Sequence, residues 1–219
     1  MEKYEILNPD ILEQFAISFV RELCNDKLNH YIRNESTNES KENIIHSAIL
    51  WSRESVFEIN NSKLLYGNKN VGDLLLFIDY MDILLEATEQ IYRVLYATKS
   101  QFPDNGSLCF HDAPQQYSKE TSRQYFKEIR AMFSSHPINL KDPDGKKRFA
   151  DIPLPYSRAN DIAGWKGDFS VRLWTATKDD EDTIHFPLYI KDLIDYAQLI
   201  YSRYIQFEQR LAQIANQEI

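Results

Sequence analysis

A run of apolar residues, spaced alternately three and four positions apart over residues 190–214, constrains the fold most strongly. The run consists of Ile190, Leu193, Ala197, Ile200, Tyr204, Phe207, Leu211 and Ile214. This spacing places the side chains on one stripe of a long helix. The stripe has to be covered by other helices of the same chain or by a second subunit, and the pattern does not choose between the two. The chain should therefore be built mainly from packed helices.

Residues 71–98 show a second pattern of the same kind. Its apolar positions are Leu74, Ile78, Met81, Leu85, Tyr92 and Leu95. They predict a long bundle helix. Asp79, Asp82 and Glu86 share another face of this helix, but no Glu-x-x-His sequence accompanies them. We interpret the three carboxylates as a solvated face and expect no metal site there.

Two further helices are predicted before residue 60. Asn8, Pro9 and Asp10 form a good helix start, because Asn8 can cap the first turn and Pro9 suits its first position. That helix should run to about Ile32. Residues 34–41 contain no apolar side chain and are predicted to form a mobile connection. A shorter helix should follow over residues 42–59, and residues 60–70 read as a loop.

The pattern changes from helical to alternating near residue 169. Phe169, Val171 and Leu173 alternate with polar residues, and the acidic residues 179–182 separate this segment from a second one at 183–186. The alternation predicts a small β-hairpin over about 167–187, in which His185 packs across the strands. Residues 141–147 are predicted to form a turn. The expected architecture is a mainly α helical bundle, one domain over residues 1–219, with this hairpin before the last long helix.

The composition supports a packed core, since 43% of the residues are hydrophobic and 13% are aromatic. We expect Trp51, Trp165 and Trp174 to pack in this core or on the hairpin. The first residues show no signal-peptide pattern, and no apolar run approaches the roughly 18 residues of a membrane helix. Cys24 and Cys109 are too few for a disulfide framework. These features predict a cytoplasmic protein with reduced thiols and no membrane partner.

Charge is distributed unevenly along the chain. The net charge is −8, yet residues 119–172 contain 11 Lys and Arg against 7 Asp and Glu, a net +4, which leaves −12 for the remainder. The overall charge argues against broad nucleic-acid binding. The locally basic segment is the exception.

One helix inside this basic segment carries a pair of candidate functional residues. Its apolar positions are Tyr125, Ile129, Met132 and Phe133. We expect Ser118 to cap its start, and Pro137 should end it at about His136. Arg130 keeps its positive charge at all working pH values, whereas His136 can gain or lose a proton near neutrality. Such a pair suits chemistry on phosphate esters.

The pair resembles the motif of HEPN-domain proteins, in which an Arg is followed after four to six residues by a His at the end of a bundle helix. Here the gap is five residues, Ala131 to Ser135. The loop, hairpin and last helix that follow are similar to those of extended bacterial HEPN proteins. Ala131 departs from the polar residue that usually follows the Arg, and no tyrosine closely follows His136. The second difference separates this chain from toxins that are silenced by nucleotide modification of such a tyrosine.

The resemblance implies a metal-independent endoribonuclease of toxin or phage-defence type, without a cofactor, whose composite site forms at a homodimer interface. Arg130 would stabilise the negative charge growing on phosphorus, and His136 would move protons. Ser134, Ser135 and Asn139 would support them. The side chains expected to hold the RNA backbone are Lys127, Lys146, Lys147 and Arg148. An antitoxin or another defence protein would be a further partner.

Helix geometry gives a reason for the dimer. Six positions on an ideal helix turn by about 600°, so Arg130 and His136 would point about 120° apart, and one subunit alone would bring them together poorly. Ala131 and the net charge of −8 favour a different function, that of a HEPN-like dimeric interaction or nucleotide-binding module without catalysis. The basic segment and the position of His136 favour the enzyme. Small-molecule sensing in a bundle pocket is a third possibility, supported only by the aromatic content.

Overall fold

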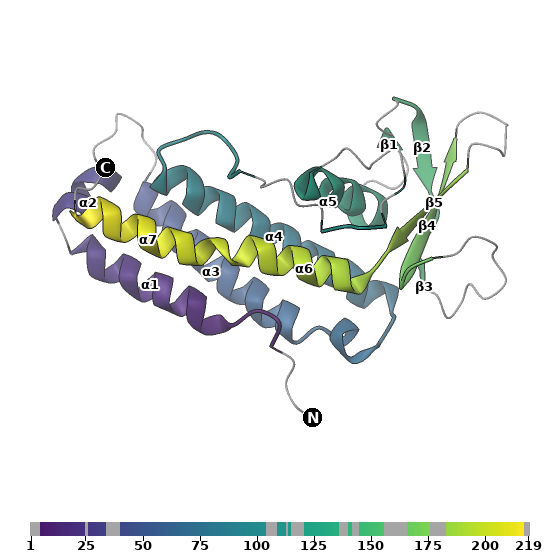
Figure 1. Ribbon diagram of the computed structural model, residues 1–219, viewed down its shortest axis with the longest axis horizontal. Coiled ribbons are helices and arrows are strands. Elements are labelled where there is room, and N and C mark those ends of the chain that lie inside the picture. The colour runs from purple at the N-terminus through teal and green to yellow at the C-terminus, as the bar shows by residue number, and fades with distance from the viewer. Residues whose placement is uncertain are drawn as a thin grey trace. The chain divides into compact units, whose positions relative to one another are not determined.

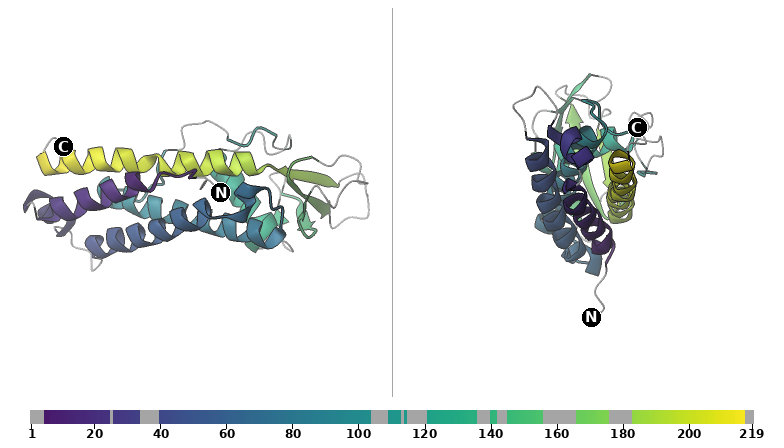
Figure 2. Two further views of the ribbon diagram at one scale, coloured as in Figure 1. Left: turned by 90° about the horizontal axis from the view of Figure 1, so that it is seen from below. Right: turned by 90° about the vertical axis from the view of Figure 1, so that its left-hand side faces the viewer.

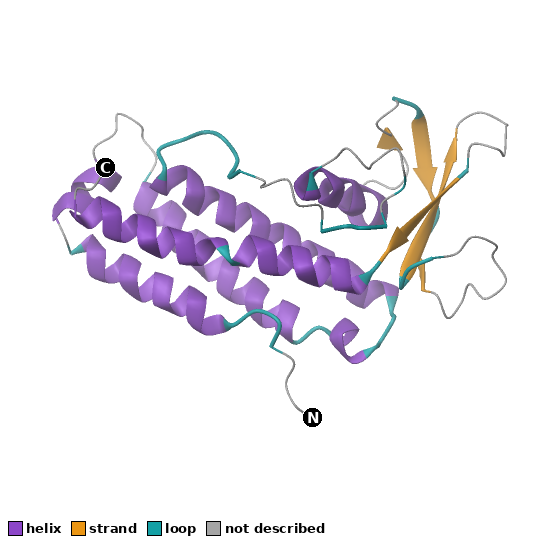
Figure 3. Cartoon of the chain, in the orientation of Figure 1, coloured by secondary structure: helices purple, strands orange, loops and turns teal. Residues whose placement is uncertain are grey.

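The computed structural model confirms a mainly helical protein with a small antiparallel sheet (Figure 3). It describes residues 5–24, 26–33, 40–103, 109–112, 114, 121–135, 140–141, 145–155, 166–175 and 183–216. The chain divides into two compact units. Unit 1 comprises Met1–Asn61, Tyr80–Pro103 and Ala197–Ile219, and unit 2 comprises Ser62–Asp79 and Asp104–Tyr196. Each unit has its own buried core.

Unit 1 is a bundle of helices. It contains α1 (Pro9–Leu23), α2 (Asp26–Arg33), α3 (Lys41–Asn60), the part of α4 (Val71–Leu95) from Tyr80 onward, the end of α6 (Ile190–Tyr201) and α7 (Arg203–Asn216). Helix α1 lies alongside both α3 and α7 (Figures 1 and 2). None of the helices within the described part of the chain is long and apolar enough to cross a membrane.

The start of α1 follows the prediction, but its end does not. The Asn8 side chain accepts a hydrogen bond from the Asp10 backbone N–H at 3.0 Å, and Pro9 occupies the first turn. The expected continuous helix to Ile32 is wrong, because α1 ends at Leu23 and α2 begins at Asp26. The sequence at this position, Asn25-Asp26, consists of residue types that favour helix ends over helix interiors.

The next two helices lie close to their predicted bounds. Helix α3 is capped by Ser40, whose hydroxyl accepts from the Asn43 backbone N–H at 3.2 Å. Helix α4 ends three residues before the predicted Thr98, because Ala97 adopts a left-handed φ of 46° and the Thr98 N–H donates back to the Arg93 carbonyl at 3.1 Å. The predicted loop at 60–70 contains one short 3-10 helix, η1 (Lys63–Tyr66).

Aromatic side chains from α1 and α7 form the core of unit 1. The Phe15 ring lies 5.5 Å from that of Tyr204 and 6.1 Å from that of Phe207, measured between centroids. The second half of the C-terminal stripe is therefore covered by a helix of the same chain. The predicted single long helix is interrupted at Ser202, whose hydroxyl donates to the Leu199 carbonyl at 2.8 Å. Such a bond back to the preceding turn loosens helical geometry.

Unit 2 contains the sheet. The predicted hairpin is confirmed as β4 (Phe169–Thr175) and β5 (Ile184–Leu188), paired antiparallel. Three short strands were not expected: β1 (Leu140–Lys141), β2 (Lys147–Ala150) and β3 (Leu154–Pro155). Strands β2 and β3 pair one after the other with the same edge of β4, and β1 pairs with β2. The prediction of one hairpin alone is thus wrong, because β4 lies at the centre of a larger sheet.

Helix α5 (Ser122–Arg130) and the π-helical segment η3 (Ala131–Ser135) provide the other layer of unit 2. Thr121 caps α5 and forms a capping box with Gln124, so the predicted cap at Ser118, which lies outside the described residues, is wrong. The Tyr125 ring stacks on that of Phe186 from β5, with centroids 5.1 Å apart. Phe133 contacts the same ring at 6.2 Å. These contacts fix α5 and η3 to the sheet.

Candidate functional site

Arg130 is the last residue of α5 and is half-buried. Its neighbours along the apolar stripe, Ile129, Met132 and Phe133, are all buried, as the sequence predicted. The regular helix stops at Arg130, and η3 continues the chain as a π-helical turn through Ser135. Because a π turn has a wider hydrogen-bond ring than an α-helix, the angle calculated for an ideal helix between positions 130 and 136 does not apply here.

Of the residues predicted to support this pair, the structure describes the side chain of Ser134 but not those of Ser135 and Asn139. The Ser134 hydroxyl donates a hydrogen bond to the Asp79 carboxylate from α4, at 2.8 Å. Ser135 ends η3, but its side chain is not among those that the structure describes. His136 and Asn139 also lie outside the described residues. The structure therefore gives the surroundings of Arg130 and Ser134, and the role of His136 stays a prediction.

Three of the four predicted RNA-binding side chains are exposed. Lys127 lies on the outer face of α5, Lys146 precedes β2, and Lys147 begins β2 with its ammonium 5.5 Å from the centre of the Phe149 ring. Arg148 differs, because only 3% of its surface is exposed. A side chain buried to this extent cannot hold an RNA backbone at the surface of this fold, so Arg148 is better placed for a structural role.

A cluster of ionisable groups at the start of α6 was missed in the sequence. Asp192 is only 8% exposed, and its burial raises the pKa of the carboxyl group. The charge of His111 opposes this rise, whereas that of Asp112 adds to it. Asp192 lies about 80 positions along the chain from the adjacent pair His111 and Asp112, so no local motif could have indicated that these groups lie near one another. Among the residues with described positions, no group of three or more His, Cys, Asp or Glu is arranged to hold a metal ion.

The tryptophans differ from one another in their surroundings. Trp174 lies on the sheet as predicted, where its Nε1–H donates to Asp151 at 2.8 Å and the Arg172 guanidinium lies 4.0 Å from the centre of its ring. Trp165 lies outside the described residues. The expectation that Trp51 packs in the core is wrong, because 54% of its surface is exposed.

Comparison of the chain with protein-family models, with curated proteins and with solved structures finds no match. What can be said about function therefore rests on the residues and their geometry.

Proposed function

We propose that this chain is a cytoplasmic, metal-independent endoribonuclease of the HEPN-like toxin or phage-defence kind, which cleaves RNA with Arg130 and His136 at a homodimer interface. The observation that supports the proposal best is the π-helical turn η3, which begins directly after Arg130 and ends directly before His136. Single π-helical turns are rare, and those that lie inside α-helices occur frequently at functional sites; η3 extends the end of α5 in the same π-helical conformation. The irregular backbone thus spans the five residues that separate the two proposed catalytic side chains.

The packing around Arg130 suits a charge-stabilising role. The buried side chains of Ile129 and Met132 flank it and hold its backbone against the core of unit 2. A half-buried guanidinium interacts more strongly with a nearby charge than one fully in water, because the surrounding dielectric constant is lower. In the proposed reaction Arg130 stabilises the charge that grows on phosphorus, and His136 transfers the protons of the 2′-hydroxyl and the leaving oxygen.

The exposure and hydrogen bonds of the other proposed site residues limit the roles that these residues can have. Lys127, Lys146 and Lys147 are exposed and can contact phosphates of the RNA backbone. The Ser134 hydroxyl already donates to Asp79, so its oxygen remains as an acceptor only. We therefore assign Ser134 to positioning η3 against α4 and not to binding phosphate.

The second candidate function is a helical interaction or ligand-binding module without catalysis. Ala131, the first residue of η3, offers no hydrogen-bonding side chain next to Arg130. A groove between α3 and α4 of unit 1, lined by Trp51 and by two acidic residues, independently favours a binding function. An antitoxin or other defence protein would be a partner under either proposal.

Cleavage of RNA in the presence of EDTA tests the proposed activity. Purified wild-type protein, Arg130→Ala and His136→Ala are incubated with labelled tRNA and a structured mRNA, and the fragments are examined for 2′,3′-cyclic phosphate ends. We expect wild-type protein to cleave and both variants to lose at least about a hundredfold in rate, as is typical for removal of a general acid–base or an oxyanion-stabilising group.

His111→Ala is the matched control, because it removes an exposed histidine from the same unit outside the proposed site. It should retain the wild-type cleavage pattern. If folded wild-type protein leaves all RNAs intact, or if His136→Ala cleaves as well as wild type, the nuclease proposal is wrong and the binding module becomes the better interpretation.

A further inference from the structure

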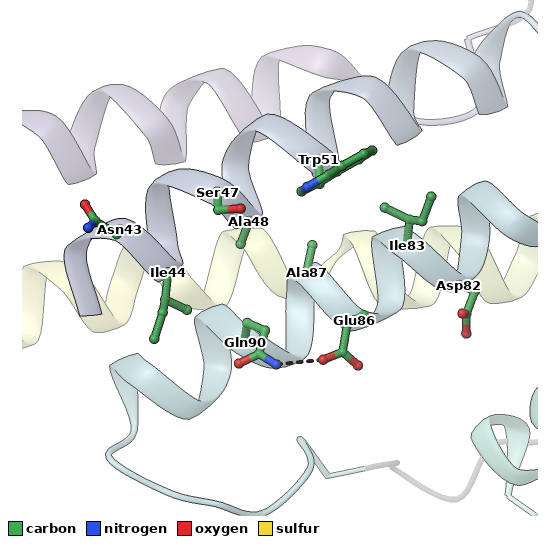
Figure 4. Close-up of a pocket in the computed structure, with 10 residues that line it drawn as sticks. All are labelled: Asn43, Ile44, Ser47, Ala48, Trp51, Asp82, Ile83, Glu86, Ala87 and Gln90. Carbon is green, nitrogen blue, oxygen red and sulfur yellow. Dashed lines mark hydrogen bonds between the residues drawn. The ribbon is translucent and has the colours of Figure 1, made fainter. Parts of the chain in front are cut away.

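A groove of about 620 Å³ lies between α3 and α4 in unit 1 (Figure 4). Its floor includes Ala48 from α3 and Ala87 from α4, both buried. Their methyl side chains are too small to fill the space between the two helices. Ile44 and Ile83 add further apolar surface to the lining. The volume falls within the range of about 300–1,000 Å³ that is usual for sites binding small molecules.

Trp51 is the largest side chain that lines this groove, and its exposure has no structural explanation within unit 1. Helix α3 buries one apolar face through residues such as Ile45, Ile49 and Val56. Leu50, Trp51 and Phe57 extend from the same helix and are all more than half exposed. A helix with apolar residues on two sides usually has a partner for each side. An indole is also the aromatic ring that attracts a positive charge most strongly through its face.

The polar groups of the groove have a single sign of charge. Asp82 and Glu86 lie one turn apart on α4, and no lysine, arginine or histidine is found among the described residues of the lining. Glu86 accepts a hydrogen bond from the Gln90 side chain at 2.6 Å, which holds its carboxylate at the rim. Two carboxylates in a hollow with apolar walls produce a negative potential that concentrates cations.

We propose that this groove binds a small organic cation, an ammonium or guanidinium group attached to an apolar body. Trp51 would contact the cationic head through its ring, Asp82 and Glu86 would neutralise the charge, and the isoleucines would enclose the apolar part. This binding site goes beyond the proposed nuclease, because it uses other residues, and it requires no RNA.

The chemistry of the lining disfavours other occupants. An anionic ligand would be repelled by Asp82 and Glu86. A neutral apolar ligand would remove water from these carboxylates and offer them no partner in return, which is unfavourable. A second copy of the same face would bring the acids of both copies together. A cation with an apolar body matches both the negative charge of the two carboxylates and the apolar, electron-rich face of the indole.

Binding of defined probes tests the proposal. Titration calorimetry would measure benzyltrimethylammonium, phenethylammonium and butylguanidinium against the full chain, with phenylacetate and benzyl alcohol as anionic and neutral controls. At the affinity per heavy atom that is usual for drug-sized ligands, benzyltrimethylammonium should bind with a Kd of about 4 mM or lower. We expect at least one cation to bind tenfold more tightly than either control.

Variants in the groove should separate this site from the rest of the surface. Trp51→Ala, and Asp82→Asn combined with Glu86→Gln, should each weaken binding of the cation at least about tenfold. Two matched controls change exposed residues of α3 that do not line the groove: Leu50→Ala removes apolar surface, and Glu54→Gln removes a negative charge. Both should bind the cation like wild type.

Several results would overturn the proposal. One is that none of the three cations shows binding at concentrations up to about 10 mM, which exceeds the Kd expected for benzyltrimethylammonium. Another is that the neutral and anionic probes bind equally well, or that Leu50→Ala weakens binding as much as Trp51→Ala. If a basic amphipathic peptide binds at Trp51 while the small cations do not, the groove is a docking site for a protein segment. RNA cleavage is measured separately, so failure of either proposal leaves the other intact.

Discussion

Tyr201 shows how one hydroxyl group joins distant parts of unit 1. Its oxygen accepts a hydrogen bond from the Leu12 backbone N–H at 3.1 Å, and its proton is donated to the Asn8 carbonyl at 2.7 Å. The hydroxyl thus bridges the two backbone groups of the first turn of α1. Burial raises the pKa of Tyr201 well above its usual value, so the group stays protonated and remains a donor.

Tyr204, three residues further along the chain in α7, provides a comparison within unit 1. Its side chain is fully buried, and its hydroxyl contacts Ser52, which itself donates to the Ala48 carbonyl at 2.7 Å. Thr88, its other partner, donates to the Leu84 carbonyl at 2.7 Å. Burial raises the pKa of Tyr204 to about 12. Both hydroxyl partners therefore keep a backbone acceptor if the Tyr204 oxygen is removed.

This difference predicts unequal effects of two chemically identical substitutions. Tyr201→Phe leaves the buried N–H of Leu12 without its acceptor and should lower the free energy of unfolding by about 2 kcal/mol. Tyr204→Phe leaves no donor without an acceptor and should lower it by about 1 kcal/mol. Urea denaturation followed by circular dichroism measures both values, with unchanged m-values showing that only stability has changed. Equal losses would show that the Tyr201 bridge does not contribute as described.

At the residue scale, features formed by neighbouring residues are predictable from the sequence, whereas contacts between residues far apart along the chain are not. The cap at Asn8 followed from three neighbouring residues. Tyr201, the last residue of α6, contacts that cap from 193 positions away, and only the folding of unit 1 brings them together. Trp51 was expected to be buried because tryptophan usually is, but residue type does not determine which face of a helix is covered. The Arg130–His136 spacing identified a candidate that still requires its experiment.

At the scale of elements, glycine determines how β4 begins. Gly167 has a φ of +88°, and a Cβ atom there would lie 2.9 Å from the backbone N and O of Leu188 and from the O of Phe169. Only glycine fits such a close approach of two strands. The next residue continues the junction, since the Asp168 carboxylate accepts from the Ile190 N–H at 2.9 Å and caps α6.

Two glycine substitutions separate backbone conformation from steric overlap. Gly145 has a similar φ of +78°, yet nothing lies within 4 Å of its Cβ position. Gly145→Ala should therefore lower the free energy of unfolding by about 1 kcal/mol through conformation alone. Gly167→Ala adds the displacement of β5 and should lower it by about 3 kcal/mol or more. Thermal unfolding and hydrogen exchange of the β4 and β5 amides would measure both effects.

The proposed steric overlap at Gly167 would be contradicted if Gly145→Ala and Gly167→Ala were equally stable. That result would mean that the strands separate without cost. A smaller effect on exchange at β4 than elsewhere would also contradict it, because the overlap lies at the start of that strand.

The elements themselves differ in how well the sequence predicted them. The stripe at 190–214 and the alternation at 169–173 are long enough to show a period, and both were recognised. Strands β1 and β3 have two residues each, and Pro155 in β3 is a residue usually excluded from strands. No periodicity exists in so short a segment. Their pairing depends on β4 being present, which is a property of the assembled sheet.

At the scale of the whole molecule, the net charge of −8 determines how a nucleic acid can approach. Most of the surface repels a polyanion, so RNA binding under the nuclease proposal must use the locally basic segment and must weaken as salt increases. A dimer in which each subunit contributes an arginine and a histidine to one cleft brings two copies of this segment together. The proposed site is then a property of the pair of chains.

Mixing two inactive variants tests this arrangement. A homodimer of Arg130→Ala would have two histidines and no arginine, and a homodimer of His136→Ala would have two arginines and no histidine. Their heterodimer would retain one arginine and one histidine from opposite subunits. Random reassortment would make about half of all dimers heterodimers. If one Arg–His pair suffices, we expect the mixture to recover RNA cleavage, up to about half of the wild-type rate, where each variant alone has almost none.

Co-expression of differently tagged variants, with purification through both tags, ensures that heterodimers are present. Cleavage is then compared with each homodimer at equal concentration and in EDTA. Double-tagged dimers as inactive as either parent, alongside an active wild-type enzyme, would mean that one arginine and one histidine from opposite subunits do not suffice, because either both pairs are needed or each pair acts within one subunit. In the second case the π-helical turn would have to bring the two side chains together by itself, because an ideal helix would point them about 120° apart.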